Sequence, residues 1–258
     1  METKELFPLA TLLARLSYKA DTRIKQEIEA NNLSLVAIHN IKNKYMFKSK
    51  TEVLKFYIAD DLEQGIRYFV IRGSAGNFNN WLNNLFAFNT DKNELGEVHS
   101  GFWSEARSVW DTMKQYQDFS KEQILIGHSK GSSLAHLIAP MLKADISVGI
   151  ASPFFASKEY VNNAKKTKFK TIYYDIIHNL DIVPIVTYPL FTPVGDVYYI
   201  DRKDNLILNP STVRNISDTI ISFLIKRYKD KQTLHDMLFY HCYTRYAEFF
   251  KINHRKAK

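Results

Sequence analysis

The sequence predicts an α/β fold in which a central, mostly parallel sheet has helices on both faces and an antiparallel portion at its N-terminal side. Two patterns lead to this prediction. In the second half of the chain, short apolar runs alternate with stretches of helical spacing, which is typical of a parallel sheet covered on both faces. Before them, runs rich in β-branched and aromatic residues follow one another with brief polar breaks, which indicates antiparallel strands.

The N-terminal part is expected to contain two helices followed by strands. Residues 5–18 and 21–31 carry apolar side chains at helical spacing, and Asp21 is the predicted N-cap of the second helix. The composition then changes to that of strands, which we expect at 33–40, 44–49, 53–60 and 66–73.

The remaining elements alternate between helices and strands. A helix is predicted over 99–117, with one apolar face formed by Phe102, Ala106, Val109, Trp110 and Met113. A strand at 123–127 leads into a second helix, whose apolar face is Leu134, Leu137, Ile138, Met141 and Leu142. The further elements are strands at 146–152, 170–177 and 196–201 and helices at 157–166, 211–231 and 233–250. No repeat, linker or break in composition divides the chain, so we expect a single domain over residues 1–258.

Composition excludes several classes of protein. Hydrophobic residues are 45% and aromatic residues 14% of the chain, too much for a disordered or fibrous protein. The single Cys242 allows no internal disulfide, and no apolar run approaches the roughly 18 residues that span a bilayer. The N-terminus lacks the basic region of a secretory signal. We therefore expect a cytoplasmic protein, or one exported without an N-terminal signal peptide, with peripheral membrane association open to it.

The charge of the chain favours an anionic partner. The net charge is +8, with basic clusters at 165–170, 226–231 and 254–258. Such clusters bind anionic membrane surfaces or nucleic acid, or they are solvated lysines without a partner. No nucleic-acid-binding motif accompanies them, so nucleic acid ranks below a membrane surface. Nothing in the sequence predicts a cofactor or a metal site.

The pentapeptide Gly127-His128-Ser129-Lys130-Gly131 fits the pattern G-x-S-x-G, between the predicted strand at 123–127 and the helix after it. In a nucleophile elbow the serine sits on a sharp turn between strand and helix, and flanking glycines avoid a clash with the neighbouring backbone. The alternative is an ordinary serine in a turn. The surrounding strand and helix favour a nucleophile in an α/β-hydrolase fold.

A serine nucleophile needs donors for the oxyanion that forms during attack. The backbone N–H of Lys130, at the start of the helix, is the natural first donor. A second donor should come from an earlier loop at the same edge of the sheet. The segment 72–77 offers the N–H and the hydroxyl of Ser74.

A serine nucleophile also needs a base and an acid that orients it, in the chain order serine, acid, histidine. Asp181 follows a predicted strand and precedes a turn marked by proline, whereas Asp175 lies inside that strand and suits a structural role. The downstream histidines are His136, His178, His235, His241 and His254. We expect His136 to face outward from its helix, and His254 lies in a basic tail. The residues alone leave His235 and His241 as equal candidates for the base.

Together these segments resemble the class 3 lipases, the family of fungal triacylglycerol lipases and related phospholipases A1. The matching motifs occur in the family's order over roughly residues 8–250, at 69–74, 80–81, 98–102, 127–131, 151–153, 181–184 and 235–241. The resemblance implies Ser129 as nucleophile, Asp181 as acid and His235 as base. It also implies oxyanion donors at Ser74 and at the N–H of Lys130.

The family resemblance also concerns the segment after Ser74, which forms a lid in the family. Here residues 75–90 contain the apolar side chains of Phe78, Trp81, Leu82, Leu85 and Phe86, which are candidates for a lid or an acyl pocket. The alternative is a helix buried permanently in the core. One departure from the family is Lys130, which stands where leucine is usual. A lysine beside the pocket would favour an anionic head group.

These observations predict a serine hydrolase that cleaves carboxylic esters of lipids, as a phospholipase A or a lipase. The helix over 212–229 is apolar on one side and basic at its end, so it could rest on a membrane surface or simply cap the core. Two alternatives remain. One is a catalytically silent module that binds a membrane or a protein, and the other is a soluble esterase or acyltransferase.

Overall fold

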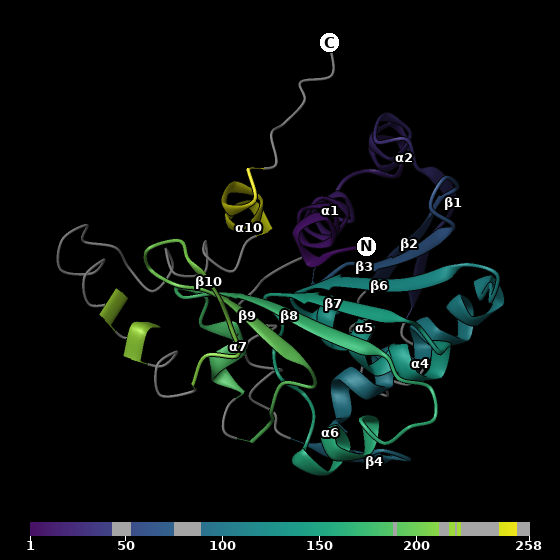
Figure 1. The fold of residues 1–258 in the computed structure, drawn as a ribbon. Helices are drawn as coiled ribbons and strands as arrows, with labels where there is room; N and C mark the ends of the chain where they lie inside the picture. Colours follow the sequence, from purple (N-terminus) through teal and green to yellow (C-terminus); the bar gives the residue numbers. More distant parts are fainter. Residues whose placement is uncertain are drawn as a thin grey trace.

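The computed structural model describes residues 1–42, 53–74, 89–187, 190–211, 217–219, 221–222 and 243–251. Within these residues, an eight-stranded sheet of order β1-β2-β3-β6-β7-β8-β9-β10 runs through the centre, with helices above and below it (Figure 1). β1, β2 and β3 are antiparallel, and β3, β6, β7, β8 and β9 are parallel. The prediction of a mostly parallel sheet with an antiparallel N-terminal portion is confirmed.

Except for β10, the strands of the main sheet agree with predicted runs to within a few residues, and the strand predicted at 44–49 lies outside the described residues. The strands are β1 Ser34–Lys42, β2 Val53–Asp61, β3 Ile66–Ile71, β6 Glu122–His128, β7 Ile146–Ile150, β8 Ile172–His178, β9 Asp196–Ile200 and β10 Leu206–Leu208. The last of these pairs antiparallel to β9 and was not predicted. A separate hairpin, β4 Thr90–Asn93 and β5 Gly96–His99, was also missed, because its strands are short and polar.

The helices divide between the two faces of the sheet. One face carries α1 Thr3–Leu16, α2 Asp21–Ala30 and α10 Tyr243–Phe249, and the other carries α4 Ser100–Met113, α5 Lys130–Leu142 and α6 Lys158–Ala164 (Figure 1). A 3-10 turn, η1 Lys114–Tyr116, extends α4, and a short α7 spans Val183–Val186. The N-cap of α2 is Ala20, so the prediction for Asp21 is wrong. Asp21 is the first helical residue, and its carboxylate lies 2.7 Å from Nζ of Lys55 on β2.

The sheet separates two apolar cores. Successive residues of β2 point to opposite faces, so that Phe56 and Ile58 pack beneath α4 and α5 while Tyr57 and Ala59 pack beneath α1. Leu125 and Ile126 of β6 divide in the same way. Burial on both faces explains why the central strands read as continuous apolar runs.

The parallel strands bring three of the predicted functional segments to one edge of the sheet. Ser74 follows the end of β3, Ser129 follows β6 directly, and Asp181 lies three residues after β8. The ladder continues past the strand ends, since the N–H of Ser129 donates to the carbonyl of Ile150 at 2.8 Å. Because β7 alone separates β6 from β8, Ser129 and Asp181 follow strands that are about 10 Å apart.

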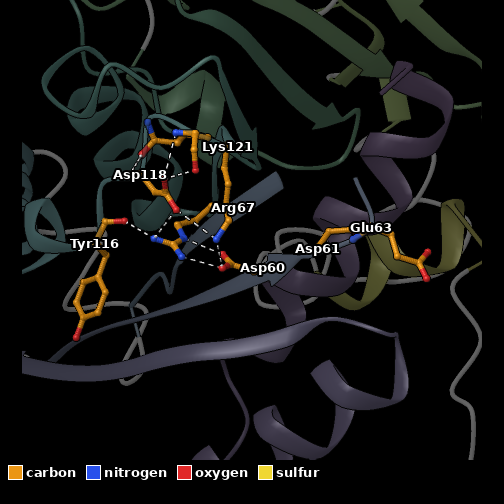
Figure 2. Close-up of polar contacts among 9 residues, drawn as sticks. Asp60, Asp61, Glu63, Arg67, Tyr116, Asp118 and Lys121 are labelled. Carbon is orange, nitrogen blue, oxygen red and sulfur yellow. Dashed lines mark hydrogen bonds and ion pairs between the residues drawn. The ribbon is translucent and has the colours of Figure 1, made fainter. Parts of the chain in front are cut away.

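At the edge of the sheet opposite Ser129, a cluster of charged side chains links β2, β3 and the residue before β6 (Figure 2). Arg67 at the start of β3 donates through Nε and Nη2 to the two carboxylate oxygens of Asp60, each at 2.7 Å. Lys121, just before β6, donates to the same carboxylate at 2.7 Å, and Arg67 also donates to the carbonyl of Tyr116. Burial alone would raise the pKa of Asp60, but the hydrogen bonds from Arg67 and Lys121 outweigh it and lower the pKa.

We expect Asp60→Asn to lower the free energy of unfolding at pH 7 by roughly 2 kcal/mol, the scale of lost charged hydrogen bonds. A carboxyl whose pKa is lowered by folding stabilises the protein above its unfolded pKa of about 4. That contribution disappears as the pH falls through the folded pKa, so the two proteins should converge towards pH 2. Urea unfolding across this pH range measures the difference. A gap that stays constant down to pH 2 would contradict the assignment.

Candidate active site

The turn at Ser129 has an unusual backbone conformation. Its φ is 56° and its ψ is −132°, between the end of β6 and the first residue of α5. A positive φ is uncommon outside glycine, and such strain is tolerated only where the surrounding structure enforces it, which is often at a functional site. The serine therefore sits on the sharp corner that the pentapeptide predicts.

The two glycines of the pentapeptide are required by close packing. A Cβ on Gly127 would overlap the carbonyl oxygen of Gly131, across the turn. A Cβ on Gly131 would overlap the carbonyl oxygen of Ile71, at the end of β3. The elbow is thus pressed against itself and against the neighbouring strand, which fixes the position of Ser129.

Lys130 follows Ser129 directly, and its backbone and its side chain have different surroundings. Lys130 is the first residue of α5, where N–H groups have no partner within the helix and favour an anion. Its ammonium lies 2.8 Å from the carboxylate of Glu105 on α4, and both side chains are buried. The prediction that this side chain favours an anionic head group is therefore not supported, because its charge is compensated inside the protein.

The segment that contains Ser74 lies directly beside Ser129. A Cβ built on Gly73 would come within 3.0 Å of the Cβ of Ser129. The Oγ of Ser74 is buried, and it has no hydrogen-bond partner among the residues that the structure describes. A hydroxyl without a partner at this place is suited to donate to an incoming oxygen.

Tyr18, just after α1, connects the two segments that flank the elbow. Its hydroxyl accepts a hydrogen bond from the N–H of Gly73 at 3.1 Å and lies 2.8 Å from Nδ1 of His128, the residue before Ser129. Its ring stacks on Tyr243 at the start of α10, with 5.0 Å between centroids. This role cannot be predicted from the sequence, because nothing in the surroundings of Tyr18 along the chain indicates a contact 110 residues away.

Asp181 is fully buried, and each of its carboxylate oxygens has a donor. Oδ1 accepts from the N–H of Val183 at 3.0 Å, and Oδ2 accepts from the hydroxyl of Tyr246 on α10 at 2.7 Å. Burial, together with the charge of Asp181, raises the pKa of Tyr246 far above its usual value, so this hydroxyl stays protonated as a donor. Tyr246 also accepts from the N–H of His178. Tyr246 lies 65 residues from Asp181 in the sequence, and no local pattern predicts this contact.

The two described histidines downstream of Ser129 are engaged elsewhere. Nδ1 of His178 accepts from the N–H of Leu180 at 3.2 Å, and burial, assisted by the charge of Arg245, lowers the pKa of His178 to about 4. His136 was expected to face outward, and this prediction is wrong. It is buried, with Nε2 3.0 Å from Asp175 and Nδ1 2.8 Å from Ser147, because α5 is covered on the side that the helical pattern left open.

Several predicted site residues lie outside the described residues. These are the base candidates His235 and His241, the tail residue His254, and the lid candidates Phe78, Trp81, Leu82, Leu85 and Phe86. Of the predicted lid segment 75–90, only the last two residues are described, and Thr90 begins β4.

The predicted surface helix over 212–229 is described only at 217–219 and 221–222, which are helical. The hydroxyl of Ser222 accepts from the side-chain amide of Asn179 at 2.8 Å, and Asp218 accepts from the hydroxyl of Tyr199. These contacts attach this part to the strand ends next to Asp181. Ile221, in contrast, is 42% exposed.

Neither a metal centre nor a membrane span is found in the part of the chain that the structure describes. Its histidine, cysteine, aspartate and glutamate side chains form no group of three or more that could hold a metal ion. None of its helices combines the length and the apolar character that crossing a bilayer requires.

Comparison with known proteins supports the predicted family and fold. Residues 68–191 match the family described as lipase (class 3), whereas no curated protein matches the chain. Triacylglyceride lipase from Rhizomucor miehei is 19% identical, with 81% of this chain and 85% of that chain covered and a TM-score of 0.62. Lipase II from Rhizopus niveus is 18% identical, with 81% and 84% covered and a TM-score of 0.63.

A further solved structure is similar to the same extent. It is a triacylglycerol lipase whose catalytic centre is formed by a serine protease triad, 19% identical, with 82% of this chain and 86% of that chain covered and a TM-score of 0.61. At these identities the likeness concerns the fold, which is the α/β-hydrolase fold.

We expect Tyr18→Phe to slow the reaction of Ser129 with a fluorophosphonate probe by about tenfold, because the loop at Gly73 loses its link to His128. The loss should be smaller than the roughly 10² to 10³ that follows removal of an oxyanion donor itself. Labelling rates at several probe concentrations measure it. Tyr57→Phe, which loses a buried hydroxyl that donates to the carbonyl of Leu13 and not to Gly73 or His128, is the control. Equal labelling of both variants and the wild type would contradict the role of Tyr18.

Proposed function

We propose that this chain, whose residues 68–191 match the class 3 lipase family, hydrolyses carboxylic ester bonds of lipids with Ser129 as the nucleophile. The observation that carries the proposal is the strained turn at Ser129, held by two glycines at the edge of the sheet that also carries the buried Asp181. A silent binding module would have no need of this conformation, which costs energy to maintain.

In the proposed reaction, Oγ of Ser129 attacks the ester carbonyl carbon while His235 accepts the hydroxyl proton. Asp181 holds the imidazole and stabilises its positive charge. The tetrahedral intermediate collapses, the imidazolium protonates the departing alcohol, and an acyl-enzyme remains. Water, activated by the same histidine, then attacks the acyl-enzyme and releases the fatty acid.

The proposed oxyanion site consists of the N–H of Lys130 with the N–H and hydroxyl of Ser74. Two features of the described residues support it. The N-terminus of α5 carries a partial positive charge next to Ser129, and the hydroxyl of Ser74 is buried beside the elbow without a partner among the described residues. Donors of this kind act most strongly when they are fixed before the oxyanion forms.

The proposed acid is supported by its surroundings. Asp181 accepts hydrogen bonds from the N–H of Val183 and the hydroxyl of Tyr246, and these fix the position of the carboxylate. A carboxylate that orients a histidine must be held in this manner. The serine protease triad described for the triacylglycerol lipase of the same fold is consistent with this assignment.

We further propose that the lipid is a phospholipid and that the protein works at an anionic membrane surface. The net charge of +8 supports this proposal, since it attracts the chain to anionic lipid. The basic clusters contribute differently, however. Residues 165–170 immediately precede β8 and so lie at the edge of the sheet opposite Ser129. The cluster at 226–231 is therefore the better candidate for membrane contact.

We expect Ser129→Ala to abolish hydrolysis of a short p-nitrophenyl ester, leaving at most a residual rate about 10³ to 10⁴ above that in water. The variant should also fail to react with a fluorophosphonate, whereas the wild type is labelled. A soluble ester assay with mass spectrometry of the labelled peptide checks both. Hydrolysis by Ser129→Ala at the wild-type rate would refute the assignment, and an inactive, unlabelled wild type would favour the silent module.

The identity of the base is tested by His235→Gln and His241→Gln in the same assay. The family resemblance implies that His235→Gln lowers kcat by about 10⁴ or more, with His241→Gln close to the wild type. Tyr243, two residues after His241, lies against His128 with 5.9 Å between ring centroids. His241 is therefore the natural second candidate, and the reverse result would transfer the role to it.

At low salt, we expect the protein to bind vesicles that contain anionic phospholipid more tightly than neutral vesicles. We also expect it to hydrolyse the anionic phospholipid faster than the neutral one. Neutralising Lys226, Arg227 and Lys229 should weaken binding by roughly 3 kcal/mol, or about 1 kcal/mol for each cation. Neutralising Lys165, Lys166 and Lys168 is the matched control and should have little effect. Vesicle sedimentation and a lipid panel with Ser129→Ala as the blank measure these effects. Equal binding to neutral and anionic vesicles would contradict the proposed electrostatic attraction to the membrane. Equal rates on dissolved and aggregated esters would favour a soluble esterase.

A further inference from the structure

A buried ion pair adjoins the elbow from the side of α4. The ammonium of Lys130 and the carboxylate of Glu105 are 2.8 Å apart, and the two side chains are 3% and 10% exposed. Lys130 follows Ser129 directly, whereas Glu105 lies in the middle of α4, which packs beside α5 on the same face of the sheet (Figure 1). The pair therefore joins the first turn of α5 to a neighbouring helix.

The electrostatics of this place require the carboxylate. The N-terminal end of a helix carries a partial positive charge and disfavours a cation, and a buried ammonium is costly unless it is paired. Lys130 is both a cation at a helix N-terminus and a buried ammonium. The carboxylate of Glu105 compensates this charge in both respects. The reverse also holds, because Glu105 without Lys130 would leave a buried negative charge beside the place where the oxyanion is proposed to form.

The helix that supplies Glu105 is firmly held. On either side of Glu105, the α4 residues Phe102, Ala106, Val109 and Met113 are buried in the core beneath α4 and α5. Glu105 therefore has a fixed position relative to the sheet. The ammonium of Lys130, paired with this carboxylate at 2.8 Å, is held in place as well, and with it the backbone of the first turn of α5.

We propose that Glu105 is a positioning residue, which holds Lys130 so that the backbone N–H of Lys130 is directed at the oxyanion. The proposal rests on the proposed function of Ser129 and Lys130. The side chain of Lys130 then serves the geometry of the site, and selection among head groups must come from other residues.

The test compares Lys130→Met, Glu105→Gln and the double variant Lys130→Met/Glu105→Leu. Each single change should lower kcat on a soluble p-nitrophenyl ester by about tenfold or more, with KM changed less than about twofold, as expected when only the transition state loses stabilisation. The affinity for a trifluoromethyl ketone, which forms the oxyanion with Ser129, should fall in parallel. The double variant should recover the melting temperature, because apolar side chains replace the pair without leaving a buried charge. Its kcat should stay about tenfold below the wild type, close to that of the single variants, because the pair that positions Lys130 is missing in all three.

Two controls separate positioning from stability. Asp60→Asn breaks a buried ion pair at the opposite edge of the sheet, so it should lower the melting temperature and leave kcat and inhibitor affinity unchanged. Glu105→Asp shortens the side chain by one methylene and keeps its charge, so it serves if a single variant does not fold. It should lower kcat several-fold with a smaller loss of melting temperature.

The proposal is overturned if the Glu105 and Lys130 variants lose melting temperature but keep kcat and inhibitor affinity. It is also overturned if the loss in the double variant is the product of the two single losses, since the residues would then act independently. A wild type that neither hydrolyses the ester nor reacts with a fluorophosphonate would refute the proposed function itself. An active, labelled wild type with fully active Glu105 variants would refute this inference alone.

Discussion

The backbone conformation of Ser129 is the constraint on which the rest of the site depends. A φ of 56° in a non-glycine residue costs of order 1–3 kcal/mol, so the surrounding contacts must impose it. They do so from three directions: β6 and α5 are pressed together at Gly127 and Gly131, β3 closes one side, and the N–H of Ser129 is bonded to β7. The packing of the central strands thus fixes the position of the Ser129 side chain.

The helices on one face of the sheet hold the loops next to Ser129 and Asp181 in place. α1 leads to Tyr18, which bridges Gly73 and His128, and α10 supplies Tyr246, which holds Asp181. The two helices contact each other, and Tyr18 stacks on Tyr243 at the start of α10. The first and last described helices therefore hold the segments that contain Gly73, His128 and Asp181, all of which are distant in the sequence from these helices.

The sequence was sufficient for features that depend on local pattern. The elbow at Ser129 follows from five adjacent residues, and the strands before Ser129 and Asp181 follow from apolar runs. The sequence was insufficient for burial and for contacts that depend on tertiary packing. His136 was expected at the surface, because a polar residue on an amphipathic helix is usually exposed, yet α5 is buried around that residue. Tyr18 and Tyr246 contact residues 110 and 65 positions away, and Glu105 contacts a neighbouring helix. No local spacing indicates such contacts.

The charges near the elbow constrain how a lipid can be recognised. Lys130 is neutralised by Glu105, and His136 is paired with Asp175, so two basic side chains on the elbow helix are committed inside the fold. The exposed lysines at 165–170 precede β8 and lie at the edge away from Ser129. Under the proposed function, attraction to an anionic surface has to act through cations other than these, and the elbow should recognise the ester through its carbonyl group.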